Sequence, residues 1–591
     1  MNGSRLPGAL VTFSVAAVVI ACGNSKTGAT GADGGGGTAT STRSGQASSG
    51  SKGGPGSSTN SSGATASGST ASTSSTDSGS SGSSATSSSG ATTSDAGGTG
   101  AESVLQRNKH LNRDGLFIEP TLTKAAAATM VLDSTFNVTS IAGNVYAAPL
   151  YMTNGPGGNG AFFVATQSNT VYAISEADGS NLWSRTIGTP ATKTGAGCGN
   201  IGPLGITGTP AIDPVSRTMY LDAVIGNATT ILRHEIHALS IDDGTERAGW
   251  PVNASTLKAS GLTFNPVTQN QRGALLLLGD TVYVPYGGHY GDCGTYYGWV
   301  IGVPTANPSG ATAYVTAAQG SGIWAPGGPS SDGTSIYLST GNAFNSTVPM
   351  QGESIVRLGA GAVFSGSTVD FFAPSNWEYL DSKDLDLSGT GAMIVDVPGA
   401  TPSALVVGLG KNGVAYLLDR SNFGGVGTGN GTTGEGLVSA SVSAGQISNA
   451  PTMYTTAMGV YVVFVSNGGG KGVGCPAGQI GNLVALRIGA ASPPTINVAW
   501  CADNLGGGSP ITTTTDGESN AVVWTAGAEG SGVTASKQLH GFDGDTGALV
   551  YAGGGTASTM PNQVRHFNSP IVANGRVIVA ADNGLYAFKV P

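Results

Sequence analysis

Short apolar runs alternate with polar turns from about residue 145 to the end of the chain. The stretch Ala161–Pro190 shows the pattern most clearly. Two runs of β-branched and aromatic residues, Phe162–Thr166 and Thr170–Ser175, are separated by a short polar turn, which is typical of a β-hairpin. A second turn at Asp178-Gly179 favours a residue that tolerates positive φ, and Leu182-Trp183 is expected to begin a third, outer strand.

Both faces of this predicted sheet are apolar. Along Thr170–Ser175, Val171 and Ala173 point to one side, and Tyr172 and Ile174 point to the other. A strand that is apolar on both faces is typical of a sheet packed between two other sheets. Since one unit cannot bury both faces alone, copies of it are expected to stack beside it.

Such copies follow at irregular spacing. Eight points resemble the start of a fresh unit, most with Pro or Gly before an apolar strand: Ala148–Leu150, Thr209–Ala211, Arg272–Ala274, Ala325-Pro326, Gly391–Met393, Ala450–Thr452, Ser509–Ile511 and Ser569–Ile571. The last copy stops before its outer strand, and the unassigned run Met130–Val138 is expected to supply it and so to close a ring without exposed sheet edges. We therefore predict an all-β protein, an eight-bladed β-propeller over residues 130–591, with seven blades as the alternative. Residues 101–129 form a lead-in segment with a short helix expected around Lys124–Thr129.

The N-terminus has the pattern of an export signal. The apolar run Leu10–Ile20 is too short to span a bilayer as a stable helix and is typical of a signal-peptide core. Val19-Ile20-Ala21-Cys22 resembles the bacterial lipobox, which implies that residues 1–21 are removed and that Cys22 is acylated. A plain secretory signal with an incidental cysteine is the alternative. Gly23 after the cysteine favours the outer membrane. We thus expect an exported protein, lipid-anchored to the cell envelope.

Residues 22–100 consist almost only of Ser, Gly, Thr and Ala. They lack the apolar side chains that offset chain entropy, so this stretch is predicted to be a disordered tether with an end-to-end distance of about 50 Å. A glycosylated stalk is the alternative.

Composition and cysteines narrow the class of protein further. Only 10% of residues are charged and the net charge is −9, with no Lys/Arg block, so a nucleic-acid partner is excluded. We expect the propeller to be monomeric. No CxxC spacing is present, which excludes a covalently attached haem. The four cysteines after Cys22 should pair in an exported protein, and of three connectivities we favour Cys198–Cys293 and Cys475–Cys501.

Two other motifs have structural explanations. Gly408–Gly413 matches GxGxxG, but it leads into a strand rather than a helix, so we interpret it as a hairpin turn. His234-Glu235-Ile236-His237 is one residue short of HExxH, and on a strand its two histidines point to opposite faces, which argues against a zinc pair.

The unit core YAISEADGSNLW resembles the pyrroloquinoline-quinone (PQQ) enzyme repeat, and the resemblance covers Val145–Pro591. In that family the repeat builds eight-bladed propellers, both in quinoprotein alcohol dehydrogenases and in non-catalytic lipoproteins of outer-membrane protein assembly. The resemblance therefore implies a fold, and it leaves open whether the chain is a catalyst or an adaptor.

Four segments in the middle of the chain resemble the dehydrogenase site. The resemblance implies that Trp324 stacks under the quinone and that Lys411, in Gly410–Gly413, touches its oxygens. Asn342, in a segment like the family's TGN, would help to bind calcium. Asp384, in Lys383-Asp384-Leu385-Asp386, would act as the catalytic base and contribute to the metal site.

Three features depart from that family. No two cysteines are adjacent, no haem site supplies an electron acceptor, and the calcium-binding glutamate would fall near Gly287–Gly294, where only His289 and Asp292 offer ligands. We therefore predict a membrane-anchored binding or scaffold module for a protein, peptide or glycan partner at the propeller loops. The alternative is an alcohol or sugar dehydrogenase that depends on PQQ and calcium.

Overall fold

A computed structural model describes residues 102–428, 435–467, 470–530 and 534–591. The predicted signal peptide, the predicted acylation site Cys22 and the predicted tether over residues 22–100 lie outside this range. Within the described residues, no helix has the length and apolar character that crossing a membrane requires.

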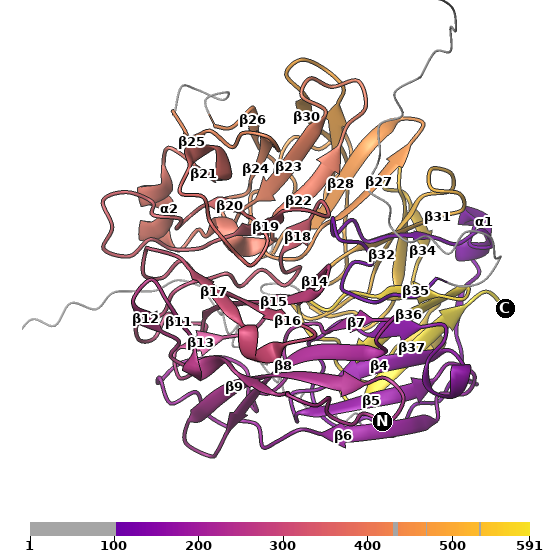
Figure 1. Ribbon diagram of the computed structural model, residues 1–591. Helices are drawn as coiled ribbons and strands as arrows, with labels where there is room; N and C mark the ends of the chain where they lie inside the picture. Colours follow the sequence, from indigo (N-terminus) through magenta and orange to yellow (C-terminus); the bar gives the residue numbers. More distant parts are fainter. Residues whose placement is uncertain (1–101, 429–434, 468–469, 531–533) are drawn as a thin grey trace, which may run out of the picture. The chain divides into compact units, whose positions relative to one another are not determined.

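Eight antiparallel sheets follow one another in chain order around a ring (Figure 1). The first four sheets are β3 (Leu150–Met152), β4 (Ala161–Ala165), β5 (Thr170–Ser175) and β6 (Asn181–Thr186); β7 (Ala211–Asp213), β8 (Thr218–Gly226), β9 (Ile231–Ser240) and β10 (Val252–Asn253); β14 (Leu276–Leu278), β15 (Thr281–Gly288), β16 (Trp299–Pro304) and β17 (Thr312–Val315), with β13 (Gln269–Asn270) beside β15; and β18 (Ser330–Ser331), β19 (Ile336–Ser339), β20 (Ile355–Leu358) and β21 (Phe371–Ala373), with β25 (Gly425–Val426) beside β21.

The second half repeats the arrangement. Its sheets are β22 (Met393–Asp396), β23 (Ala404–Leu409), β24 (Val414–Asp419) and β26 (Val438–Ser441); β27 (Thr452–Thr456), β28 (Gly459–Val465), β29 (Leu483–Gly489) and β30 (Thr495–Ala502); β31 (Ile511–Thr514), β32 (Val522–Thr525), β33 (His540–Asp543) and β34 (Leu549–Tyr551); and β35 (Ile571–Ala573), β36 (Arg576–Ala581), β37 (Gly584–Lys589) and β2 (Val131–Leu132). Outside these sheets lie the hairpin β11 (Lys258–Ala259) and β12 (Leu262–Thr263) and the helices α1 (Lys124–Ala127) and α2 (Trp377–Lys383).

The eight-bladed prediction is confirmed, and so is its physical basis. Val171 and Ala173 of β5 join a core shared with the second sheet, whereas Tyr172 and Ile174 join a core shared with the eighth. Each sheet therefore buries both faces against its neighbours, as the two-sided apolar pattern required. The first strands of neighbouring sheets contact one another, β7 with β14, β18 with β22 and β27 with β31, as strands nearest the axis should.

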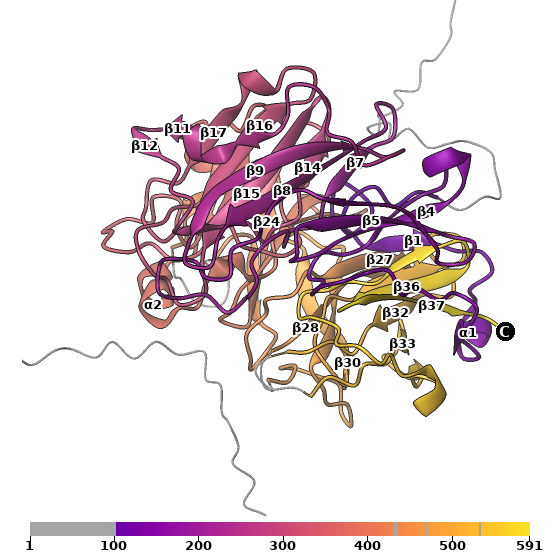
Figure 2. The ribbon, with the colours of Figure 1, turned by 90° about the horizontal axis from the view of Figure 1, so that it is seen from below.

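Strand β2 closes the ring. It pairs antiparallel with β37, in the register Val131↔Lys589 and Leu132↔Phe588, so the run Met130–Val138 supplies the missing outer strand as predicted. Figures 1 and 2 both place β36 and β37 beside β4 and β5. Across this junction the Arg576 guanidinium lies 2.9 Å from Oε1 of Glu176.

The structure contains two disulfides, Cys198–Cys293 and Cys475–Cys501, which are the pairs favoured from the sequence. The first joins a loop after the first sheet to a loop of the third sheet, and the second joins two segments of the sixth sheet. The GxGxxG match and the pair His234 and His237 also have the structural explanations that we predicted. Residues 410–413 connect β23 to β24, and His234 and His237 contact different carboxylates, those of Asp222 and Glu246.

The lead-in segment has a role that its sequence did not indicate. Residues 104–118, which we call the axial segment, lie against the innermost strands of five sheets through backbone hydrogen bonds: Val104 with Tyr151, Leu105 with Ile212, Leu111 with Ser331, Asp114 with Met453 and Gly115 with Thr512. The segment ends as β1 (Leu116–Ile118), which pairs parallel with β31. It therefore lines the channel that eight sheets leave at their centre.

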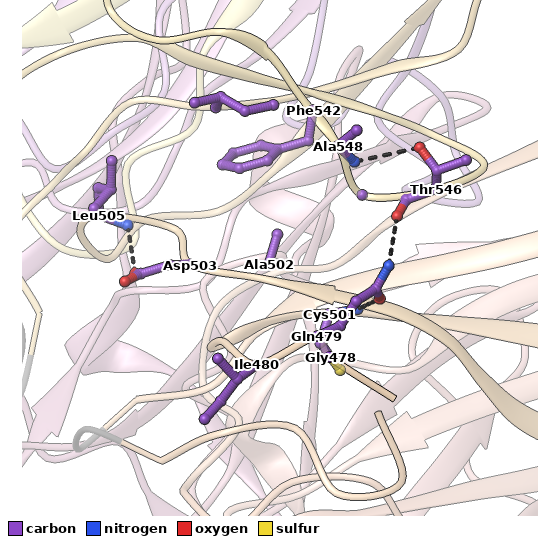
Figure 3. A pocket seen from close by; sticks show the side chains of 12 residues that line it. Gly478, Gln479, Ile480, Cys501, Ala502, Asp503, Leu505, Phe542, Thr546 and Ala548 are labelled. Atoms are coloured by element: carbon purple, nitrogen blue, oxygen red, sulfur yellow. Dashed lines mark hydrogen bonds between the residues drawn. The ribbon is translucent and has the colours of Figure 1, made fainter. Parts of the chain in front are cut away.

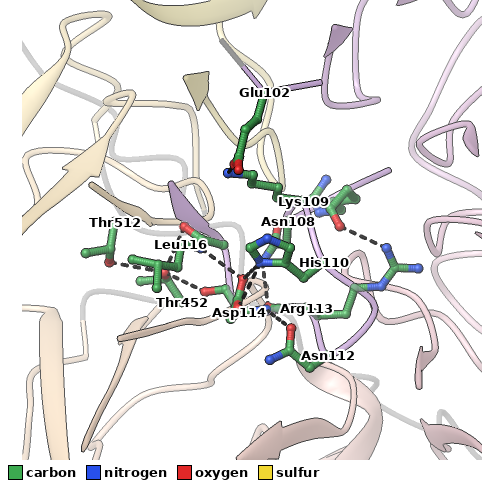
Figure 4. Close-up of polar contacts among 12 residues, drawn as sticks. Glu102, Asn108, Lys109, His110, Asn112, Arg113, Asp114, Leu116, Thr452 and Thr512 are labelled. Carbon is green, nitrogen blue, oxygen red and sulfur yellow. Dashed lines mark hydrogen bonds and ion pairs between the residues drawn. The ribbon is translucent and has the colours of Figure 1, made fainter. Parts of the chain in front are cut away.

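Side chains of the axial segment fix it further (Figure 4). Asn108 donates to the carbonyl of Pro451 at 3.0 Å, and Thr452 donates to the carbonyl of Asp114 at 2.8 Å and pairs with Thr512 at 3.1 Å. The buried guanidinium of Arg113 donates to the carbonyls of Leu275 and Pro329, both at 2.9 Å. Through Arg113, the axial segment thus contacts the third sheet as well as the five sheets named above.

Candidate functional site

The structure brings three of the predicted site residues together at the axial end of the fourth and fifth sheets. Lys411 Nζ lies 2.9 Å from Oδ1 of Asp384, 2.5 Å from Oδ2 of Asp386 and 5.2 Å from the centre of the Trp324 ring. The indole Nε1 of Trp324 donates to Oδ2 of Asp386 at 3.1 Å. These four residues form one hydrogen-bonded group, which we call the axial cluster.

Local backbone geometry explains why these side chains meet. Helix α2 ends at Lys383, and its C-cap residue Asp384 has a φ of 53°, the left-handed conformation in which helices commonly end. Lys411 lies in the tight turn between β23 and β24, which Gly413 permits with φ of 73°. Trp324 approaches the backbone of β15 so closely that a Cβ on Gly287 would lie 3.2 Å from the Trp324 Cβ.

Burial and like charges govern the electrostatics of the axial cluster. Burial, followed by the charge of Asp386, raises the pKa of Asp384 to about 6, although Lys411 opposes the shift. Burial acts to lower the pKa of Lys411, but Asp386 and Asp384 outweigh it, so that its pKa is raised and the ammonium stays charged. The lysine is thus held between two carboxylates that compete for it.

A third carboxyl, from Glu353, lies behind the axial cluster. Glu353 is fully buried, and one of its oxygens accepts from the backbone N–H of Leu387 at 2.8 Å. Burial first, and then Asp386, raise its pKa well above the usual range. Nothing in the sequence singles out Glu353 or favours Asp386 over Asp384, because both assignments depend on which groups the fold buries together.

Asn342 and the acidic loop of the third sheet do not complete a calcium site. The buried Asn342 Oδ1 has no hydrogen-bond partner, and Asp292 accepts from the Tyr296 hydroxyl at 2.6 Å. His289 is buried, which lowers its pKa to about 4 and leaves the imidazole neutral. Within the residues that the structure describes, no group of three or more His, Cys, Asp or Glu side chains is arranged to hold a metal ion. Calcium takes six to eight oxygen ligands, so Asn342 and Asp384 alone do not complete its coordination shell.

Arg272, which is not among the predicted site residues, also lies near the Trp324 ring. The Arg272 guanidinium carbon is 5.9 Å from the centre of the Trp324 ring and 5.4 Å from that of Phe567. A signal for it existed in the sequence, because among the eight predicted unit starts only Arg272 opens with a charged side chain.

A separate apolar recess lies between the sixth and seventh sheets (Figure 3). It has a volume of about 540 Å³, and Phe542 and Ala502 contribute to its walls. Around it stand three large apolar side chains with high exposed fractions, Ile480 at 62%, Leu549 at 52% and Leu505 at 45%. Sequence reasoning missed this recess, since its residues come from two different units.

Gln479 ties the two walls of the recess together. Its amide donates to the carbonyl of Thr546 in the seventh sheet at 3.0 Å, and its oxygen accepts from the N–H of Cys501 in the sixth sheet at 2.9 Å. Leu505 holds φ at 52°, a conformation that is costly for a large side chain and that concentrates at binding sites.

No family model matches the chain, and no curated protein matches it. Solved structures do match. Quinohemoprotein alcohol dehydrogenase from Comamonas testosteroni aligns with a TM-score of 0.53 and 14% identity over 83% of this chain and 80% of that chain. Quinohemoprotein alcohol dehydrogenase ADHIIG from Pseudomonas putida HK5 gives 0.55 and 13% over 83% and 80%.

A europium-containing methanol dehydrogenase gives a TM-score of 0.54 and 14% identity over 82% of this chain and 90% of that chain. The chain has the propeller fold of the quinoprotein dehydrogenases. The fold implied by the PQQ-repeat resemblance is therefore confirmed. At identities this low the comparison shows the fold alone, and the activity has to be argued from the site.

Proposed function

We propose that the chain is an exported, lipid-anchored β-propeller that binds a protein partner, through an apolar peptide segment of that partner, rather than a dehydrogenase. The observation that carries the proposal is the recess between the sixth and seventh sheets. Large apolar side chains rarely gather on the surface of a monomeric protein unless they contact something, and here three of them border one concave site.

The axial cluster supports the same proposal because its polar groups are already bound within the protein. Lys411 and the indole of Trp324 would have to contact a quinone, yet both polar groups are bound to the protein's own carboxylates. Among the residues that the structure describes, no group of three or more His, Cys, Asp or Glu side chains is arranged to hold a metal ion, whereas calcium takes six to eight oxygen ligands. The charged groups of the cluster thus bind one another, although Oδ1 of Asp386 is buried without a hydrogen-bond partner.

The recess can be tested with charge substitutions. Ile480→Asp with Leu505→Asp places two carboxylates where the partner's apolar side chains would pack, and Val215→Asp, on a side chain that is 91% exposed at the β7–β8 turn, is the matched control. With a photoreactive amino acid at Leu549, we expect wild type and the control to crosslink one envelope protein in intact cells. The double variant should lose at least about 90% of that product, because each buried apolar contact contributes about 1–2 kcal/mol. Crosslinking that is equal in all three proteins would refute the role of the recess.

The convergence of Trp324, Asp384 and Lys411 favours one second candidate, a PQQ-dependent dehydrogenase. A bound quinone would supply the oxidant, while Trp324 and Lys411 would hold it and Asp384 would take the proton of an alcohol substrate. This candidate requires that PQQ quench tryptophan fluorescence and that Lys411→Ala abolish the quenching. A calorimetric titration of the whole chain with PQQ and calcium that gives no heat of binding would end it.

A further inference from the structure

Among the described residues that line the recess between the sixth and seventh sheets, Asp503 alone is ionisable. The two uncharged polar side chains of the lining are already committed (Figure 3). Gln479 bonds to both walls, and the hydroxyl of Thr546 accepts from the N–H of Ala548 at 3.3 Å. Asp503 is exposed, and its carboxylate accepts from the N–H of Leu505 at 3.1 Å. This one carboxylate therefore sets the charge that an occupant of the recess has to match.

The protein does not neutralise Asp503 itself. The structure gives this carboxylate no ion pair among the residues that it describes. Its charge acts on His540, but burial lowers the pKa of that imidazole to about 4 and Asp503 offsets only part of the shift, so His540 is neutral at pH 7. Asp503 thus depends on water for its solvation.

The opposite wall of the recess also has an excess of negative charge. This wall is the turn between β33 and β34, in which Asp543 and Asp545 directly precede the lining residue Thr546. Lys124 Nζ lies 2.7 Å from Oδ2 of Asp543 and 3.8 Å from Oδ2 of Asp545, so one ammonium serves two carboxylates. The recess is therefore apolar inside and negative at both of its borders.

An occupant of the recess changes the surroundings of Asp503. Apolar side chains that pack against Leu505 and Phe542 cover the neighbouring carboxylate and displace part of its water. A carboxylate that loses water without gaining a partner is costly, whereas a cation beside it restores the lost interaction. An acidic group at the same place would add like-charge repulsion to the loss of water.

We propose that the recess binds a basic apolar segment of the partner protein, with apolar side chains inside the recess and a lysine or arginine against Asp503. The inference rests on the function proposed above and adds to it the charge of the partner. Asp503 is then the residue that discriminates between candidate partners, because charges at the rim of an interface contribute more to specificity and association rate than to affinity. The net charge of the chain, −9, also favours the encounter with a basic segment.

The test uses the whole chain and three synthetic peptides with the sequence Leu-Ile-X-Ile-Leu and a Ser-Gly-Ser tail for solubility, in which X is lysine, glutamine or glutamate. Wild type is compared with Asp503→Asn, which keeps an oxygen acceptor for the N–H of Leu505 but removes the charge, and with Asp503→Lys, which reverses the charge. Asp516→Asn is the matched control, because Asp516 is also exposed and accepts from the N–H of Glu518, two residues further on, at 3.0 Å. Dissociation constants come from ligand-detected NMR at low and high salt.

We expect wild type and Asp516→Asn to bind the lysine peptide about two- to fivefold more tightly than the glutamine peptide, as one exposed ion pair implies, and to bind the glutamate peptide most weakly. Asp503→Asn should bind the lysine and glutamine peptides equally, and Asp503→Lys should prefer the glutamate peptide. Raising the NaCl concentration from about 0.05 to about 0.5 M should remove the preference of wild type for lysine, because salt screens an exposed pair.

Two results would overturn the inference and leave the function proposed above intact: equal binding of all three peptides to wild type, or a preference for lysine that persists in Asp503→Asn. If wild type does not bind the lysine peptide at all, the inference also fails, and crosslinking from Leu549 then decides independently whether the recess binds a partner. Binding of the glutamine peptide that survives Ile480→Asp with Leu505→Asp would place the peptides outside the recess and overturn both proposals.

Discussion

At the scale of single residues, the axial cluster is determined by competition between two carboxylates for one ammonium. Asp386 is nearly inaccessible and bonds to both Lys411 and the Trp324 indole, whereas Asp384 has a third of its side chain exposed and bonds to Lys411 alone. The axial cluster therefore depends less on the charge of Asp384 than on that of Asp386.

This asymmetry predicts that Asp384→Asn stabilises the protein in a pH-dependent way. The pKa of Asp384 in the folded chain, about 6, lies above its ordinary value of 3.8, so the folded state binds the proton more tightly. The stability that this provides is complete below about pH 4 and is lost as the pH rises to about 6. Asn also tolerates the left-handed conformation of position 384.

We therefore expect the melting temperature of Asp384→Asn to match that of wild type at pH 4 and to exceed it by about 1 °C or more at pH 7.5. Thermal unfolding between pH 4 and 8 measures this. Asp396→Asn, which removes an exposed carboxylate paired with Arg420, is the control and should change little at either pH. A variant that is less stable than wild type at pH 7.5 would mean that the Lys411 contact outweighs the repulsion from Asp386.

The sequence predicted which residues belong to the axial cluster better than it predicted the hydrogen bonds between them. Trp324, Asp384 and Lys411 come from three separate loops, and the structure brings them into contact through Lys411. Motifs could not predict that Asp386 is the central acceptor or that Glu353 lies behind it, because burial is a property of the packed sheets. Arg272 was visible only as the single charged residue at a unit start.

At the scale of elements, strands were predicted well because their pattern is local. The alternation of apolar residues in Thr170–Ser175 determines both of its faces, and the same reasoning located the strand that closes the ring. The axial segment was missed for the opposite reason. Its residues show no period of two, and its hydrogen-bond partners lie up to 460 residues further along the chain.

The two disulfides allow a quantitative prediction at this scale. Cys198 and Cys293 are 95 residues apart, and Cys475 and Cys501 are 26 apart. If each bond acts mainly on the unfolded chain, removing the longer crosslink costs about 4.7 kcal/mol and removing the shorter one about 3.5 kcal/mol. Urea unfolding of the two double Cys→Ala variants measures both losses of free energy of unfolding. The loss should be about 1 kcal/mol larger when the longer crosslink, Cys198–Cys293, is removed.

A larger loss for Cys475→Ala with Cys501→Ala would contradict this account. Cys501 is buried in the core between the fifth and sixth sheets, so the excess would measure packing in the folded state rather than chain entropy.

At the scale of the whole molecule, the ring is held from the inside as well as by its closure. Each sheet packs mainly against its two neighbours, so a ring of eight has little direct contact across its centre. The axial segment supplies that contact, since its backbone bonds reach sheets on opposite sides of the ring. Among side chains, Arg113 contributes most to this contact across the centre, because it donates to the third sheet, the fourth-sheet loop and the axial segment itself.

We therefore expect Arg113→Met to loosen the axial segment before it disrupts the sheets. The substitution leaves the carbonyls of Leu275, Pro329 and Arg107 and the amide oxygen of Gln106 without their donor, at a cost on the order of 3–5 kcal/mol. Trypsin should then cut after Lys109 in the folded variant, whereas the same bond is protected in wild type. Arg185→Met, which removes an exposed arginine of β6, should stay protected. Far-ultraviolet circular dichroism, recorded in parallel, distinguishes local release from global unfolding. If Arg113→Met is as resistant to trypsin as wild type, the axial segment is held by its backbone alone, and the arginine is dispensable for the coherence of the ring.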